Sequence, residues 1–228
     1  MTEAIIIGDI AGQYDALMRL LKKCPDYLPI SVGDMIDRGP DSKKVLDFFM
    51  AGGKAVLGNH EHMMLDLAQC KYYEIDVWVN YNGGVHTVRN FMPDTASMSY
   101  KQMREGIPAE YMDWLGSLPL YMELDNALIT HAPLHPQYSL EEACALTKCS
   151  FQSFGYTEAE ASIIWNREPP TRLWGKYQIF GHNRHHCFYT DEEDPENIEY
   201  GVCLDNSGSD QLVAMVWPSR ETIVESFC

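Results

Sequence analysis

The sequence contains no apolar run approaching the roughly 18 residues that a membrane-spanning helix needs, and no CxxC pair. The apolar segment nearest the N-terminus, residues 4–7, is too short for the core of a signal peptide. The seven cysteines are odd in number and scattered along the chain, which favours free thiols over a disulfide framework. These absences predict a cytoplasmic protein without a membrane span.

Basic residues are scarce. Lysine and arginine number 17 against 33 aspartates and glutamates, which gives a formal net charge of −16. A protein that binds a nucleic-acid backbone needs a basic surface, so the excess of acidic residues argues against nucleic acid as a partner. Part of the acidic excess lies in the run 191–196, for which we expect a solvated loop.

The 228 residues, 46% of them hydrophobic, suit one α/β domain over 1–228. Apolar runs alternate with helical periodicity, and we find no internal repeat. We predict helices over 13–23 and 43–50 and a mostly helical segment over 61–120. The predicted strands cover 4–9, 28–34, 54–60, 177–183, 202–208 and 211–217, with a hairpin over 121–132.

Five of the predicted strands end in a polar side chain, and in four of them a glycine precedes it. These strand-end residues are Asp9, Asp34, Asn59, His131 and His182. Because ligands of open α/β sheets bind outside the carboxyl ends of the strands, five such coincidences point to one shared site.

The strand-end residues form a mixed set of oxygen and nitrogen ligands. Such a set suits Mn²⁺, Fe or Zn²⁺ better than Ca²⁺, which prefers oxygen alone. A carboxylate in the set can bridge two cations, and paired cations clamp the attacking and leaving oxygens of a displacement at phosphorus. Arg38 and Arg167 carry planar guanidinium groups that match phosphate oxygens.

Five short motifs occur in order and with fitting spacing. They are "GD" (8–9), "GDMIDRG" (33–39), "GNHE" (58–61), "HA" (131–132) and "FGH" (180–182). Together they resemble the signature of the PPP-type metallophosphatases of the calcineurin-like metallophosphoesterase superfamily. "GNHEHMMLD" (58–66) and "IWNRE" (164–168) are most similar to the bacteriophage lambda-type serine/threonine protein phosphatases. The resemblance implies a metallophosphoesterase-type β-sandwich core flanked by helices, and two divalent metal ions, Mn²⁺ foremost.

The resemblance also assigns roles. Asp9 would bind the first metal and Asp34 would bridge both, while Asn59, His131 and His182 would hold the second.

The catalytic groups follow in the same way. His60 would protonate the leaving group, oriented by Asp37, and Arg38 and Arg167 would bind the phosphate. Elementary chemistry agrees on His60, because a histidine held by a carboxylate can supply a proton near neutral pH.

Two positions depart from the resemblance. The family has a histidine that binds the first metal where this chain has Ala11, so we expect one metal to bind well and the other weakly. Ala11 is either natural or introduced, and His185 or His186 could compensate for it. Leu57 stands where many protein phosphatases have arginine and is similar to the dinucleoside tetraphosphate hydrolases, whereas Glu61 favours the phosphoprotein branch.

Three functions therefore stay open at the level of sequence. The leading prediction is a dinuclear-metal phosphomonoesterase that acts on phosphoserine and phosphothreonine in proteins, with activity reduced by Ala11. The alternatives are a hydrolase of dinucleoside polyphosphates or a related nucleotide, and a binding module that keeps the fold without catalysis. The sequence does not indicate the oligomeric state.

Overall fold

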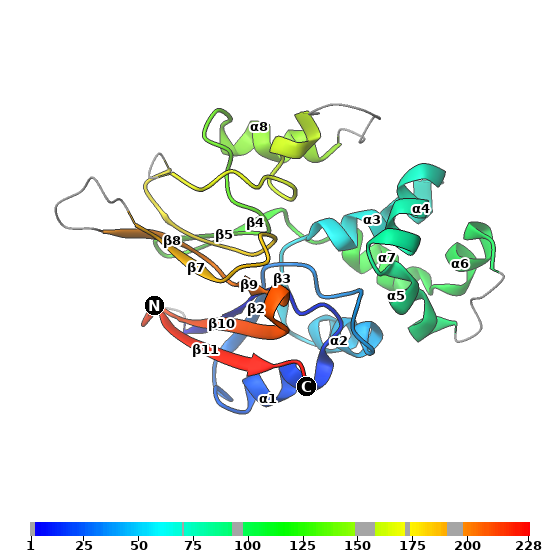
Figure 1. The fold of residues 1–228 in the computed structure, drawn as a ribbon, viewed down its shortest axis with the longest axis horizontal. Helices are drawn as coiled ribbons and strands as arrows, with labels where there is room; N and C mark the ends of the chain where they lie inside the picture. The colour runs from blue at the N-terminus through cyan, green and yellow to red at the C-terminus, as the bar shows by residue number, and fades with distance from the viewer. Residues whose placement is uncertain (1–2, 70, 93–97, 149–157, 172–173, 191–197) are drawn as a thin grey trace.

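The computed structural model describes residues 3–69, 71–92, 98–148, 158–171, 174–190 and 198–228. Two β-sheets pack face to face, with helices on both outer sides and a group of helices at one end (Figure 1). The predicted α/β sandwich is therefore confirmed. The acidic run 191–196 lies outside the described residues.

The first sheet is built around three parallel strands. Their order continues into the C-terminal strands as β11-β10-β1-β2-β3, with β9 paired to β10, and β10 runs antiparallel to β1. The strands are β1 (Ala4–Ile7), β2 (Leu28–Ser31), β3 (Lys54–Ala55), β9 (Asp205–Asn206), β10 (Gln211–Trp217) and β11 (Glu221–Ser226). The carboxyl ends of β1, β2 and β3 therefore lie at one edge.

The second sheet has the order β4-β5-β6-β8-β7. The predicted hairpin is confirmed as β4 (Tyr121–Leu124) and β5 (Ala127–Thr130), followed by β6 (Tyr177–Phe180), β7 (Cys187–Thr190) and β8 (Glu199–Cys203). Strands β5, β6 and β8 are parallel, so their carboxyl ends also share one edge. The strand-end residues thus come from both sheets of the sandwich.

The described residues of the predicted helical segment 61–120 form helices α3 to α7, which lie together at one end of the sandwich (Figure 1). They are α3 (Asn59–Gln69), α4 (Tyr72–Tyr81), α5 (Gly84–Phe91), α6 (Tyr100–Gly106) and α7 (Ala109–Gly116). Helices α1 (Tyr14–Leu21) and α2 (Ser42–Met50) pack on the first sheet, and α8 (Leu140–Ala145) lies over the second (Figure 1).

The predicted strand 54–60 is too long. Strand β3 ends at Ala55, and Asn59 and His60 form the first turn of α3. The physical reason is local: the carboxylate of Glu61 accepts the backbone N–H of Gly58 and so satisfies an N–H at the start of the helix. The amide of Asn59 and the imidazole of His60 are therefore carried by a helix N-terminus.

Alternation along β1 divides the core into two layers. Ile5 and Ile7 face the helices on the outer side, and Ala4 and Ile6 face the second sheet. All four residues are fully buried. A strand buried on both faces has a fixed register, which in turn fixes the position of the polar residue that follows it.

Two expectations from composition can be compared with the structure. The five cysteines in the described part of the chain are free, as predicted. Within the same residues, no helix combines the length and the apolar character that crossing a bilayer requires.

Candidate metal centre

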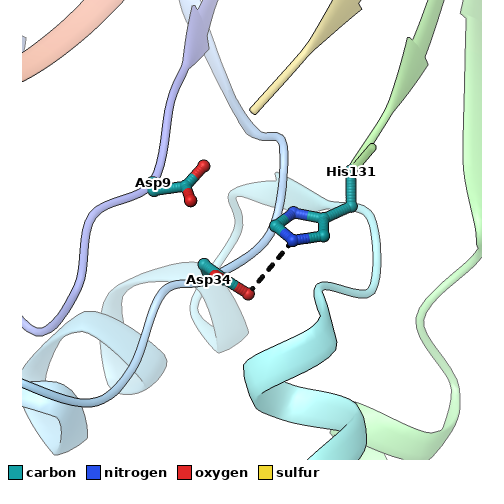
Figure 2. A group of neighbouring side chains, drawn as sticks. All are labelled: Asp9, Asp34 and His131. Carbon is teal, nitrogen blue, oxygen red and sulfur yellow. Dashed lines mark ion pairs between the residues drawn. The ribbon is translucent and has the colours of Figure 1, made fainter. Parts of the chain in front are cut away.

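The five strand-end residues meet between the two sheets. Each is less than 5% exposed: Asp9, Asp34, Asn59, His131 and His182. Ligand atoms of Asp9, Asp34 and His131 lie within 4.8 Å of one another, and Figure 2 shows the three side chains approaching from the ends of β1, β2 and β5. The predicted convergence is found, and the role of each residue as a ligand stays a prediction.

Backbone carbonyls fix the orientation of both histidines. Nδ1 of His131 lies 2.9 Å from the carbonyl oxygen of Val32, and Nε2 of His182 lies 3.2 Å from that of Trp165. A carbonyl only accepts, so each of these ring nitrogens carries the proton. The other nitrogen of each neutral ring, Nε2 of His131 and Nδ1 of His182, is left as a bare acceptor.

Both bare nitrogens point at atoms that also accept. The amide oxygen of Asn59 lies 2.8 Å from Nε2 of His131 and 3.1 Å from Nδ1 of His182. A carboxylate oxygen of Asp34 lies 3.3 Å from Nε2 of His131. Rotating the amide would place its NH₂ group against these acceptors, whereas a divalent cation would satisfy all four together. The donor set therefore fits a metal ion.

The pKa shifts at these residues match the protonation state that metal binding needs. Burial lowers the pKa of His131 and holds that of His182 well below its ordinary value, so both rings are neutral near pH 7. Burial alone would raise the pKa of Asp34, but the neighbouring histidines lower it to about 2. Ionised carboxylate and neutral imidazole are the forms that bind metals.

Asp9 has a different environment. Burial raises its pKa well above the ordinary value, and the charges of Asp205 and Asp34 raise it further, while the backbone N–H of His182 acts in the opposite direction. That N–H lies 3.2 Å from the Asp9 carboxylate. The first predicted site therefore gathers buried negative charge.

Position 11 contributes no ligand, and the two histidines considered as substitutes do not line the cavity at the site. Ala11 is buried with a φ of 50°, and its N–H donates to the carbonyl of Asp34 at 2.8 Å. His185 is exposed, and Nδ1 of His186 lies 2.6 Å from the carbonyl oxygen of Cys203.

His60 lies beside the predicted metal ligands and is held by Asp37. Nδ1 of His60 is 2.5 Å from Oδ2 of Asp37, which also accepts the indole N–H of Trp78 at 2.7 Å. The hydroxyl of Thr87 donates to the other oxygen of Asp37 at 2.6 Å. Burial would lower the pKa of His60, but the charge of Asp34 and the bond to Asp37 raise it above the ordinary value.

A small cavity of about 60 Å³ opens onto these residues. Asp9, Asp34 and Asp205 contribute buried carboxylates to its lining, and three exposed arginines also line it: Arg38, Arg167 and Arg184. Nη2 of Arg38 lies 3.0 Å from Nε2 of His60, and Arg167 donates to the carbonyl of His182 at 2.9 Å. Guanidinium groups at the mouth of a cavity lined by buried carboxylates suit a phosphate that also contacts a metal ion.

Sequence reasoning missed four residues here. Trp78 and Thr87 hydrogen-bond to Asp37 although they follow it by 41 and 50 residues in the sequence. No short sequence motif predicts such long-range contacts. Asp205 and Arg184 line the cavity. Asp205 had a usable signal, since it follows the apolar strand β8 just as the other polar residues follow theirs.

The family model for calcineurin-like phosphoesterases matches residues 3–183. A symmetrical bis(5'-nucleosyl)-tetraphosphatase of Shewanella baltica is 31% identical over 173 residues, covering 70% of this chain and 56% of the relative. The same-named protein of Dechloromonas aromatica is 32% identical over 176 residues, covering 72% and 56%. The chain thus spans little more than half the length of these relatives.

A crystal structure provisionally named a diadenosine tetraphosphatase superposes with a TM-score of 0.61. It is 22% identical and covers 98% of this chain and 92% of its own, which supports the fold. These findings correct the leading prediction: the curated relatives hydrolyse dinucleoside tetraphosphates by name, so the assignment to serine/threonine phosphoprotein phosphatases is wrong. The superfamily resemblance is confirmed, and its PPP-type and lambda-type refinement is not.

Proposed function

The chain belongs to the calcineurin-like phosphoesterase family, and from this premise we propose that it is a metal-dependent hydrolase of dinucleoside tetraphosphates. The observation that carries the metal-dependent part is the set of four acceptor atoms from Asp34, Asn59, His131 and His182 that face one another between the sheets. The substrate class rests on the relatives.

The predicted ligands would hold two divalent cations, with Asp34 shared between them and Mn²⁺ the expected metal. Such cations, when bound, neutralise charge on the phosphate and make a water molecule acidic enough to attack phosphorus near neutral pH. The protein itself supplies the fixed positions of the carboxylates and imidazoles, which are buried and held by backbone hydrogen bonds.

His60 would transfer a proton from Nε2 to the departing phosphate oxygen. Its pKa is raised above the ordinary value, whereas the pKa values of His131 and His182 are lowered, so neighbouring imidazoles shift in opposite directions. Asp37 orients the ring through Nδ1. Arg38 and Arg167, at the cavity, would hold the phosphate oxygens.

Two features of the chain agree with a polyphosphate substrate. Leu57 is buried and does not line the cavity, so no arginine acts from that position. Arg184 instead adds a third exposed guanidinium around the same cavity. A chain of several phosphates offers more oxygens for arginine guanidinium groups to bind than a single phosphomonoester does.

The test is turnover of diadenosine tetraphosphate in Mn²⁺, with a phosphoserine peptide as the comparison substrate. Symmetrical hydrolysis adds one water across the central bridging P–O bond and gives two molecules of ADP for each substrate. We expect ADP to form in that ratio and chelator to stop its formation. Absence of turnover by a protein that binds Mn²⁺ would contradict the proposal and favour a binding module.

A further inference from the structure

One buried carboxylate at the metal centre has no role in the mechanism above. Asp205 is fully buried and lines the same cavity as Asp9 and Asp34. It lies in β9, which follows β8 of the second sheet directly in the chain and pairs with β10 of the first sheet.

Backbone packing places Asp205 beside Asp9. A Cβ on Gly8 would collide with the backbone carbonyl of Leu204, so the residues that precede Asp9 and Asp205 are in direct contact. Strand β10 pairs with β1 on one side and with β9 at Asp205, which fixes the two carboxylates at one end of the same strand. Both side chains line the same cavity, and the charge of Asp205 raises the pKa of Asp9.

Two adjacent buried carboxylates need a cation or a shared proton, because buried like charges repel. Among the described residues, neither Asp9 nor Asp205 forms an ion pair with a lysine or an arginine. Asp205 accepts one N–H at each oxygen, from Arg184 at 2.5 Å and from Ser207 at 2.9 Å. Each carboxylate oxygen keeps a second lone pair for another partner.

We infer that Asp205 replaces the imidazole that Ala11 does not provide, so that the first metal site is formed by the oxygens of Asp9, Asp34 and Asp205. The inference rests on the metal dependence in the proposed function and is independent of its substrate. Three carboxylates and no imidazole suit hard cations such as Mn²⁺ and Mg²⁺ better than Zn²⁺. The two sites would then differ in metal preference, since the second carries two histidines.

The experiment counts Mn²⁺ ions bound per chain by equilibrium dialysis over a range of free Mn²⁺. The wild type should bind two ions. Asp205→Asn should weaken one site by at least about tenfold and leave the other unchanged, as even indirect partners of metal ligands cost 10–100-fold. Asp210→Asn, in the exposed turn after β9, removes the same charge outside the site and should bind like the wild type.

A rescue separates ligation from structure. Ala11→His combined with Asp205→Asn should bind two ions again, because histidine tolerates the positive φ at position 11 and supplies the imidazole. If Asp205 only holds the Arg184 loop, Asp205→Asn lowers the melting temperature of the metal-free protein and leaves both Mn²⁺ affinities unchanged, which overturns the inference.

The two proposals fail in distinguishable ways. Two bound Mn²⁺ ions in the wild type and one in Asp205→Asn support the inference even if diadenosine tetraphosphate is not hydrolysed. Turnover of that substrate with unaltered Mn²⁺ binding in Asp205→Asn supports the function and overturns the role of Asp205.

Discussion

At the scale of single residues, His60 offers a sharp test of the mechanism, because a proton donor matters most when the leaving group is basic. We expect His60→Asn to reduce turnover of an alkyl phosphate by about 10²–10⁴-fold, the usual contribution of general acid catalysis. Nitrophenolate leaves without a proton, so nitrophenyl phosphate should lose much less. Steady-state kcat on both substrates measures the difference.

The matched control is His86→Asn, which makes the same exchange at an exposed position on α5. It should leave both rates unchanged. An equal loss on the two substrates in His60→Asn would assign His60 to positioning or to metal binding instead of proton transfer.

Glu61 tests how the site is held together. Its carboxylate accepts three backbone N–H groups, those of Asp34, Met35 and Gly58, at 2.8–3.1 Å. Burial raises the pKa of Glu61 to about 8, although these N–H groups act to lower it. Glu61→Gln puts an NH₂ group against one of the donors, so we expect about 1–3 kcal/mol of lost stability in urea unfolding.

The comparison for Glu61 is Glu105→Gln, which changes an exposed pair with Lys101. Exposed pairs contribute little, and this variant should stay within about 0.5 kcal/mol of the wild type. Similar unfolding free energies for the two variants would mean that the Glu61 hydrogen bonds contribute no more to stability than an exposed ion pair does.

At the scale of elements, helices α4 and α5 hold Asp37, the partner of the proposed proton donor His60, from outside the sandwich. Trp78 on α4 is fully buried and donates its indole N–H to Asp37 at 2.7 Å, and Thr87 on α5 donates to the same carboxylate. Trp78→Phe keeps most of the ring and removes the donor. We expect a lower kcat with a larger loss on alkyl than on nitrophenyl phosphate, since the variant acts through His60.

Trp114→Phe makes the same exchange on the half-buried side of α7, away from Asp37. It should leave the ratio of the two rates unchanged. A ratio that also stays constant in Trp78→Phe would show that α4 contributes only to stability.

The sequence predicts those features of the site that depend on neighbouring residues and misses those that depend on strand pairing far along the chain. Each strand that ends in glycine and a polar residue carries its own signal, so Asp9, Asp34 and His182 were identified and the structure places them together. The contact between Gly8 and Leu204 depends on the pairing of β1, β10 and β9, which nothing near residue 205 encodes. The position of Asp205 after an apolar strand was a usable signal, but its closeness to Asp9 was not predictable from the local sequence.

The missed strands have the same explanation. Strand β11 contains only exposed and half-buried residues and packs on α1 through side-chain contacts such as Glu225 with Arg19. Strand β7 lies at the edge of its sheet and depends on antiparallel pairing with β8. Half-buried edge strands form because of the strands and helices that they pack against more than because of their own hydrophobic pattern.

At the scale of the whole molecule, the proposed metal centre lies between the two sheets and draws its ligands from both. Asp9, Asp34 and Asn59 follow strands of the first sheet, and His131 and His182 follow strands of the second. A cation held by both groups would resist separation of the sheets. Metal binding should therefore stabilise the fold as a unit.

This coupling gives the last prediction. A ligand that binds only the folded chain stabilises it by about 2.7 kcal/mol at a hundred times its dissociation constant. For a chain of this size that corresponds to a rise in melting temperature of about 5–11 °C. We expect calorimetry to show this rise with Mn²⁺ and its reversal by chelator. Asp34→Asn should abolish most of the rise, because this carboxylate would be shared by both cations in the proposed centre. A wild-type melting temperature insensitive to Mn²⁺ would contradict the metal centre itself, since no site that joins two sheets can fill without stabilising their packing.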